Sequence, residues 1–331
     1  VQSHTPGERG SADDLVQAYN FRMCLTQATN RIPIDPPADY DPVQYELLAR
    51  YIASRTPPLD LLNFMTLSNI NNADTNTLNV KTDTNNRGGA ISTDYVTGSW
   101  NYSEASHALR MDLWHEHEDY MRGFFYFLAT DSRVPANVRT EMLSWGLAAD
   151  EFVDNGGWPN QLYVREARRM VSDYVMTEAN SKGVEIPLDS VGMASYPNDS
   201  HTVSRVAVDG KVCVDGGLYV KTGGPYPVSY RCIIPKVGEC PNLFVTFALS
   251  SSHVAFSSIR MEPVFMITSQ SAASAACLAI DDEVDVQDVD YEKLEAQLLA
   301  DGQILTLESG DPNVVDNANS TKVEVIGTWT T

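Results

Sequence analysis

The segment that most restricts the fold of this chain lies between residues 242 and 280. It begins with NLFVTFALS, an apolar run of strand length, and ends with PVFMITSQSAASAACLAI, a predicted helix with proline in its first turn. The polar stretch SSSHVAFSSIRMEP joins them. In open α/β sheets, ligands bind beyond the carboxyl ends of strands, and the first amides of a helix attract electron-rich groups. The segment therefore predicts an α/β fold with a ligand site at this junction.

The predicted helix after this junction is rich in small side chains between Ser269 and Ala276. Small side chains allow a backbone or a flat cofactor to approach closely. They serve helix packing equally well, and composition alone favours packing.

The other predicted elements follow from hydrophobic spacing and turn residues. They are a half-buried strand within 15–26, a helix at 43–54 that starts after Asp41 and Pro42, a loop at 68–89, a helix at 102–129 capped by Ser103, a short helix after Pro135, a helix or strand-to-helix junction at 161–177, a hairpin at 203–220 that turns at Asp209 and Gly210, and a helix at 291–302.

Charge and hydropathy exclude several kinds of partner. The chain has 44 acidic and 23 basic residues and a formal net charge of -21, which opposes binding to nucleic acid or to an anionic membrane. No run of about 20 apolar residues predicts a membrane span. We therefore expect neither nucleic acid nor a membrane as a partner.

Cysteine and asparagine patterns bear on the compartment. The five cysteines are an odd and scattered set, and even Cys232 and Cys240, the one local pair, are predicted to be buried thiols instead of a disulfide. Acceptor triplets for N-glycosylation occur at Asn101, Asn198 and Asn319. These triplets favour a secreted, extracellular glycoprotein.

Six ordered blocks of this sequence resemble one enzyme family. They are VQAYNFRMCLT, KTDTNNRGGAISTDYV, GGWPNQLYVREARRM, SYPNDSHTVSR, PYPVSYRCIIPKVGECPNLFV and SSSHVAFSSIRMEPVFMITSQSAASAACLA. Together they span most of the chain from Leu15 to Leu305, and they resemble the glutathione-reductase-like FAD-dependent oxidoreductases, particularly the xanthan-lyase-like group. The resemblance implies an α/β fold in which a substrate or cap domain accompanies the C-terminal part of an FAD-binding domain.

The resemblance also implies FAD as the cofactor, with its ring near the helix start. The implied flavin contacts are Ser258, Ile259, Arg260, Met261, Glu262 and Gln270. The Gly-rich fingerprint GxGxxG does not occur in the 331 residues, so we expect the nucleotide-binding half upstream, or in a separate chain that pairs with this one. The chain thus resembles a fragment truncated at both ends.

Two residues of the junction are candidate catalytic groups. A neutral His253 imidazole could take a substrate hydroxyl proton while hydride passes to the flavin, although a histidine that only orients the loop is an equal alternative. Arg260 could neutralise charge on the reduced ring, or it could form a structural ion pair with Glu262 or another carboxylate.

The substrate side is predicted at Tyr19, Asn20 and Arg22, which lie at strand spacing, and at Asn85 and Asn86 in the polar loop, for which a solvated loop is the alternative. The charges Arg165, Glu166, Arg168 and Arg169 indicate a buried ion network first and substrate binding second.

Two other constellations are rejected from their spacing. Asp199, Ser200 and His201 are consecutive and point in different directions, so they do not form a hydrolase triad. His115 and His117 lie on different helix faces and His107 is about two turns away, so no metal site is predicted and a solvated face is expected.

These patterns predict a cap or substrate domain at 1–205, a returning part of the FAD-binding domain at 206–282, a C-terminal helical segment at 283–308 and the start of a β-sandwich-like module at 309–331. The leading function is two-electron oxidation of a hydroxyl- or amine-bearing substrate, with a carbohydrate as one candidate. Polysaccharide lyase chemistry and a non-catalytic, adhesive extracellular fragment are the alternatives.

Overall fold

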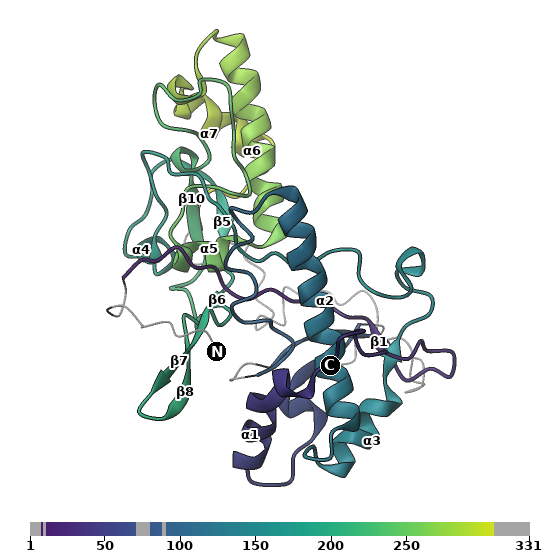
Figure 1. Cartoon of the computed structure of the whole chain (residues 1–331). Helices are drawn as coiled ribbons and strands as arrows, with labels where there is room; N and C mark the ends of the chain where they lie inside the picture. The colour runs from purple at the N-terminus through teal and green to yellow at the C-terminus, as the bar shows by residue number, and fades with distance from the viewer. Residues whose placement is uncertain (1–7, 9–10, 71–79, 88–90, 308–331) are drawn as a thin grey trace, which may run out of the picture. The chain divides into compact units, whose positions relative to one another are not determined.

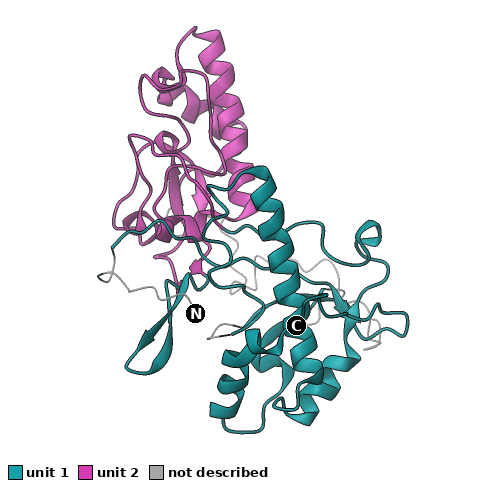
Figure 2. Cartoon of the chain, viewed as in Figure 1, with its two compact units in different colours: residues 1–165, 201–217 teal, residues 166–200, 218–331 magenta. Residues whose placement is uncertain are grey.

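The computed structural model describes residues 8, 11–70, 80–87 and 91–307. The chain forms two compact units (Figure 2): unit 1 contains residues 1–165 and 201–217, and unit 2 contains residues 166–200 and 218–331. Each unit is described by itself. Their borders differ from the predicted domain limits near residues 205 and 282, and the assignment of cap and FAD-binding parts stays a prediction.

Unit 1 combines three α-helices with short antiparallel strand pairs among its described residues (Figure 1). The helices are α1 (Glu46–Ser54), α2 (His107–Thr130) and α3 (Ala136–Ser144). The strand pairs are β1 (Leu25–Thr26) with β4 (Gly146–Leu147), β2 (Met65–Asn69) with β3 (Thr82–Asn86), and β7 (Ser204–Val208) with β8 (Lys211–Asp215). Short 3-10 turns cover Pro42–Tyr45, Leu61–Asn63 and Val153–Asn155.

Helix α2 is the longest element of unit 1 and supplies much of its core. It begins after Ser106, whose side chain accepts a hydrogen bond from the Leu109 amide, so the predicted cap at Ser103 is wrong by one turn. Gly123 faces Tyr45, and a Cβ atom at position 123 would collide with the tyrosine hydroxyl. The glycine therefore lets Tyr45 pack directly against the helix backbone.

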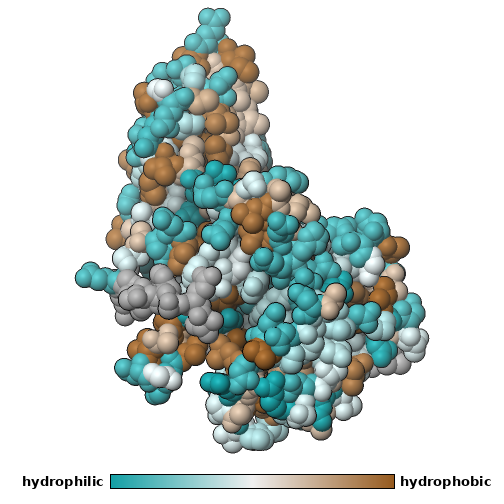
Figure 3. Space-filling view, viewed as in Figure 1, coloured by the Kyte–Doolittle hydropathy of each residue, from teal (hydrophilic) through white to brown (hydrophobic). Residues whose placement is uncertain are grey.

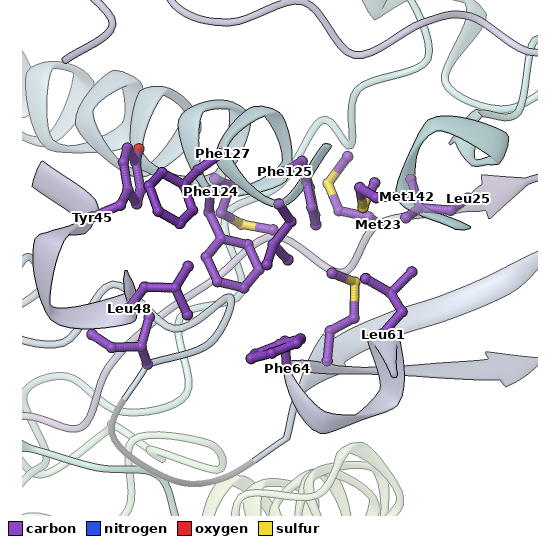
Figure 4. Close-up of a cluster of buried hydrophobic side chains, with 14 of the residues drawn as sticks. Met23, Leu25, Tyr45, Leu48, Leu61, Phe64, Phe124, Phe125, Phe127 and Met142 are labelled. Carbon is purple, nitrogen blue, oxygen red and sulfur yellow. The ribbon is translucent and has the colours of Figure 1, made fainter. Parts of the chain in front are cut away.

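The core of unit 1 is a continuous cluster of aliphatic, aromatic and methionine side chains (Figure 4). Phe124, Phe125 and Phe127 of α2 meet Leu48 of α1 and Phe64 after the 3-10 turn. All of these side chains are almost fully buried. Burial of a large apolar side chain contributes roughly 1.5–3 kcal/mol, so this cluster is the main source of stability in unit 1.

The predicted half-buried strand within residues 15–26 is extended but more deeply buried than an alternating pattern allows. Asn20 and Met23 form isolated bridges to Tyr163 and Thr84, and regular pairing starts only at β1. The predicted loop at 68–89 is wrong where the structure describes it, because Thr82–Asn86 pairs with Met65–Asn69 as β3. The backbone N–H and C=O groups of β3 are satisfied by hydrogen bonds to β2, and not by the polar side chains that the sequence suggested.

The predicted hairpin around Asp209 and Gly210 is confirmed as β7 and β8. Asp209 has φ 49° and Gly210 has φ 73°, and two successive left-handed residues define the turn that suits the right-handed twist of a two-residue hairpin. The predicted helices at 43–54, after Pro135 and at 291–302 are also confirmed, within a few residues, by α1, α3 and α7.

Unit 2 contains helices α4 (Glu178–Ser181), α5 (His253–Ile259), α6 (Glu262–Asp281) and α7 (Tyr291–Ala300) among its described residues. Strand β5 (Ser190–Ala194) pairs antiparallel with β10 (Tyr226–Ser229), and β6 (Asn198–Ser200) with β9 (Leu218–Val220). Two 3-10 turns cover Tyr230–Cys232 and Val286–Asp288. The small sheets and helices of both units agree with the predicted mixed α/β class.

Two predicted elements of unit 2 are wrong. NLFVTFALS forms no strand: Val245 donates its amide to Ile233, but Phe247 is 64% exposed and no ladder continues from there. The 161–177 segment, of which residues 166–177 belong to unit 2, is neither a helix nor a strand-to-helix junction, because it has no regular structure apart from isolated bridges. In both cases apolar content predicted regular structure, whereas a strand also needs a neighbour with which to pair.

Helix α6 follows the predicted element at 263–280 closely. By length and composition this helix could cross a membrane, a property that it shares with core helices of water-soluble proteins. About a third of its most apolar segment is buried. Met266 and Ile280 are exposed on it. On the face drawn in Figure 3, hydrophobic residues are interspersed with hydrophilic ones.

The cysteine prediction is confirmed in part, and one glycosylation site is not supported. All five cysteines are free thiols, but only Cys232 of the local pair is buried, and Cys240 is half-buried. Asn101 is exposed, whereas Asn198 is fully buried and donates its Nδ2 to Ser181 and to the Val254 carbonyl. A glycan attaches at that Nδ2, so the folded chain cannot carry one at Asn198. Asn319 lies outside the described residues.

Candidate functional site

His253 is the first residue of α5, and it lies between a carboxylate and a hydroxyl. Ser252 caps the helix by accepting a hydrogen bond from the Ala255 amide. The His253 Nδ1 atom is 2.7 Å from Glu166 Oε1, and its Nε2 atom is 3.0 Å from Ser200 Oγ. Because an ionised carboxylate only accepts, Nδ1 donates to Glu166 and a neutral ring keeps a lone pair on Nε2. The imidazole is thereby held in the form that accepts a proton at Nε2.

Glu166 is the buried anchor of this group. Its side chain is 2% exposed, and Arg169 Nη1 donates to the same Oε1 at 2.7 Å. Burial raises the pKa of Glu166, but the hydrogen bond from His253, the charge that His253 carries once protonated, and Arg169 outweigh this effect and hold the pKa below its usual range. Glu166 is therefore ionised near neutral pH and ready to stabilise an imidazolium.

Ser200 completes the group from strand β6. It pairs with Leu218 of β9, and the residue is almost fully buried. The rejection of a triad from residues 199–201 is correct for those three residues, since Asp199 contacts Arg260 and His201 contacts Asp94. Ser200 nevertheless contacts His253, which in turn contacts Glu166. No local motif in the sequence indicates this group.

Arg260 caps the C-terminus of α5 and is 6% exposed at its side chain. Its Nη2 donates to the Asp199 carbonyl at 3.1 Å and lies 3.3 Å from Asp199 Oδ2. Asp199, and not Glu262, is therefore its acidic neighbour. The buried Arg260 Nε has no hydrogen-bond partner among the described residues, and an unpaired buried donor is costly unless a ligand accepts from it.

The other predicted flavin contacts differ in accessibility. Ser258 and Ile259 are fully buried in α5, and the Ser258 hydroxyl donates to the Tyr196 carbonyl while it accepts from Tyr226. Met261 is half-buried at the start of α6, and Glu262 and Gln270 are exposed on it. Gln270 also lines a cavity of about 410 Å³ with Met193, Pro225 and Ile267. The role of these residues stays a prediction.

The predicted substrate residues lie in unit 1 and do not form one surface. Tyr19 and Asn20 have no exposed area, and Asn20 donates to Asn85 Oδ1 and Thr93 Oγ1. Arg22 forms an ion pair with Asp83, and its Nε donates to that carboxylate at 2.8 Å. Asn85 and Asn86 are half-buried in β3. As placed, Tyr19 and Asn20 cannot touch a ligand without a rearrangement.

The buried ion network predicted from YVREARRM is split between the units. In unit 1, Arg165 donates to the Asn20 and Asn85 side chains and lies 3.8 Å from Asp94. Asp94 in turn binds His201 Nδ1 at 2.7 Å. In unit 2 the network is that of Glu166 and Arg169, and Arg168 is exposed. The sequence predicts that Glu166 belongs to a structural ion network, whereas in the structure it also contacts the candidate base His253.

The three helix histidines form no metal centre, and no group of metal ligands occurs elsewhere in the described part of the chain. The expected solvated face is wrong for His117, which is fully buried against Tyr19 and Tyr95. Its Nδ1 lies 2.6 Å from the Leu113 carbonyl. Burial lowers its pKa to about 4, so this ring is neutral in the folded protein.

Comparison with known proteins gives one match. No curated protein and no solved structure matches the chain. A family model described as FAD dependent oxidoreductase matches residues 3–298, which is most of the sequence, and FAD is the cofactor of that family. The match takes in α5, α6 and the Glu166, Ser200 and His253 group. The chain belongs to the FAD-dependent oxidoreductase family.

Proposed function

We propose that this chain carries the proton-accepting part of a site that oxidises a hydroxyl- or amine-bearing substrate by two electrons. The observation that supports the proposal is the hydrogen-bonded series from Glu166 through His253 to Ser200. It directs Nδ1 of the imidazole to a carboxylate and leaves Nε2 as the nitrogen that accepts a proton. Removal of a proton from a substrate O–H or N–H requires such a base.

The described residues of unit 2 fit the ring end of FAD. The start of α6 adds few donors, because Pro263 has no amide hydrogen and the Val264 and Phe265 amides donate to the Met261 carbonyl. The orphaned Arg260 Nε, however, is a buried cationic donor. Donors of this kind suit the carbonyl oxygens and ring nitrogens of an isoalloxazine. No GxGxxG run is present for the diphosphate, and we propose that residues outside this chain hold the nucleotide end.

The chain's own residues divide the work of proton removal. When bound, FAD supplies a two-electron acceptor for the substrate hydride. His253 Nε2 takes the substrate proton, either directly or through the Ser200 hydroxyl, which would receive a proton from the substrate as it passes its own to Nε2. Glu166 stabilises the imidazolium that results, and Arg169 keeps Glu166 in place. Arg260 stabilises negative charge that develops beside the start of α6.

Further features of the protein belong to this proposal. We take the substrate to be a carbohydrate and the protein to be secreted, with Asn101 as an exposed glycosylation site. Its partner would be the nucleotide-binding half of the enzyme. These statements rest on the family resemblance and on the acceptor triplets.

The test uses the protein together with whatever chain copurifies with it. Flavin bands in the visible spectrum are recorded first, and bleaching of those bands by candidate sugars, alcohols and amines is then followed without oxygen. We expect His253→Gln to slow bleaching by about a hundredfold or more, because a general base contributes 10²–10⁴-fold. His115→Gln, which changes an exposed histidine, is the matched control. Equal bleaching rates in His253→Gln and the control would refute the base assignment.

A second candidate function is acyl transfer by Ser200. The Ser200, His253 and Glu166 side chains form the hydroxyl, imidazole and carboxylate series of a serine nucleophile. In that reaction Oγ would bond to a substrate carbonyl carbon as its proton passes to Nε2, His253 would return the proton to the leaving group, and water would then cleave the ester. A fluorophosphonate probe distinguishes the two functions: it loses fluoride and labels Ser200 only if that serine is nucleophilic.

A further inference from the structure

Unit 1 contains a cavity of about 480 Å³ that none of the sequence predictions addresses. Its wall is formed by the turn before α1, by α1 and α2, by the 91–97 segment and by one residue of β7. The residues that carry chemistry are Asp39, Tyr45, Tyr95, Glu116, Asp119, Tyr120 and Arg205. A cavity of this size accommodates a ligand such as a monosaccharide or a small amine.

Three solvent-exposed carboxylates line this cavity. Asp39, Glu116 and Asp119 have no hydrogen-bond or ion-pair partner among the described residues, unlike Glu118 of the same helix, which pairs with Arg122. The pKa of Asp119 is raised, first by burial and then by the negative charges of Asp39 and Glu118. Against these three charges stands the single guanidinium of Arg205, so the lining has a formal charge of -2 (three negative, one positive).

Another part of the cavity wall is aromatic. Tyr95 and Tyr120 stack with ring centroids 4.6 Å apart and ring planes 15° apart. The Tyr120 hydroxyl donates to the Ser92 carbonyl at 2.7 Å, and the Tyr45 hydroxyl donates to the Tyr120 carbonyl at 2.9 Å. These hydrogen bonds hold the rings in place. Fixed tyrosine rings beside carboxylates attract cations through both ring quadrupole and charge.

We infer that this cavity binds an organic ammonium ion, with the amine among Asp39, Glu116 and Asp119 and the carbon skeleton against Tyr95 and Tyr120. A metal ion is a poorer occupant, because the carboxylates do not converge closely enough to form a metal-ligand group in the described part of the chain. An organic cation can satisfy separated carboxylates through several N–H donors, and its apolar part can cover the rings. The net charge of -21 assists the approach of a cation at low salt.

The inference is tested by calorimetric titration of the whole protein with glucosamine, ethanolamine and glucose. Glucose has the shape of glucosamine but lacks its charge. We expect saturable binding of at least one cation at millimolar or lower concentration, weakened by added salt, and binding of glucose at least about tenfold weaker than that of glucosamine. Equal binding of glucose, or no binding of either cation, would overturn the inference.

Variants locate the binding to the cavity. Asp119→Asn is expected to weaken cation binding about three- to tenfold, which corresponds to one lost charge interaction at a partly exposed site. Asp112→Asn changes an exposed carboxylate of α2 that does not line the cavity, and it should leave binding unchanged. Equal weakening by both variants would show a general charge effect and overturn the assignment to this cavity. Because both changes are at the surface, loss of folding does not confuse the result.

Discussion

Among the described residues, each unit has a histidine paired with a carboxylate at 2.7 Å. In unit 1, His201 Nδ1 binds Asp94, and both side chains are almost fully buried. In unit 2, His253 Nδ1 binds Glu166, which is equally buried, but the His253 side chain is 30% exposed. The two pairs share their geometry and differ in the access of solvent and ligand to the imidazole.

This difference separates a structural pair from a reactive one. The Asp94 carboxylate lies 3.8 Å from the buried Arg165 guanidinium, so this pair belongs to a buried structural network. The Glu166 pair has a histidine whose second nitrogen meets a hydroxyl at the edge of the buried region. Distance alone therefore does not identify a catalytic histidine, and the comparison predicts that disruption of one pair reduces stability while disruption of the other reduces activity.

The largest expected effect is on stability, from Asp94→Asn. This change removes the negative charge that faces His201 and lies 3.8 Å from the buried Arg165 guanidinium. We expect a loss of about 3 kcal/mol in the free energy of unfolding, measured by chemical denaturation. The matched change Asp83→Asn breaks the partly exposed pair with Arg22 and should cost less than about 1 kcal/mol. Similar losses of unfolding free energy for both variants would contradict the structural role of the Asp94 pair.

Next in size is the effect of Glu166→Gln on catalysis. Glutamine keeps the shape of the side chain but not the charge that stabilises the His253 imidazolium. We expect kcat for flavin reduction to fall about ten- to a hundredfold with KM nearly unchanged, and Glu166→Asp to retain more activity than Glu166→Gln. Circular dichroism checks that the variants are folded. A rise in KM at constant kcat would instead place Glu166 in substrate binding.

A pH-dependent effect of similar or smaller size is expected at His117, a third histidine that has no carboxylate partner in the described structure. Burial lowers its pKa from 6.5 to about 4, so between these values the unfolded chain binds a proton that the folded chain does not. Stability from this residue is therefore lost as the pH falls through that window. His117→Phe should be close to wild type at pH 7.5 and more stable by about 2 kcal/mol at pH 5. The free energy of unfolding of both proteins is measured by chemical denaturation at the two pH values. The same difference between variant and wild type at pH 7.5 and at pH 5 would contradict this prediction.

The smallest expected effect concerns the hairpin of unit 1. Gly210 has φ 73°, a conformation that costs an L-residue about 1 kcal/mol or more. Gly210→Ala should lower the free energy of unfolding by about that amount, and Gly210→Asn by less, because asparagine tolerates left-handed backbone. Neither change should alter the flavin reduction rate. A larger loss for asparagine than for alanine would mean that the turn is limited by space and not by φ.

Local elements were predictable where one short-range effect dominates. The helix α6 follows from its initial proline and its run of apolar and small residues, and the β7–β8 hairpin follows from Asp209 and Gly210. NLFVTFALS failed because its apolar residues meet no neighbouring strand, and β3 was missed because its polar residues pair with β2. Strand formation depends on a partner that composition does not name.

The candidate site divides in the same way. From the sequence alone come the family, the FAD cofactor, helix α6, and His253 as a candidate base. Glu166 and Ser200 become the partners of His253 only in the folded chain, since they are 87 and 53 residues away from it along the sequence. A hydrogen bond depends on a few tenths of an ångström between side chains. Such distances are fixed by the packing of β6, α5 and the extended 166–169 segment, and not by the spacing of residues in the sequence.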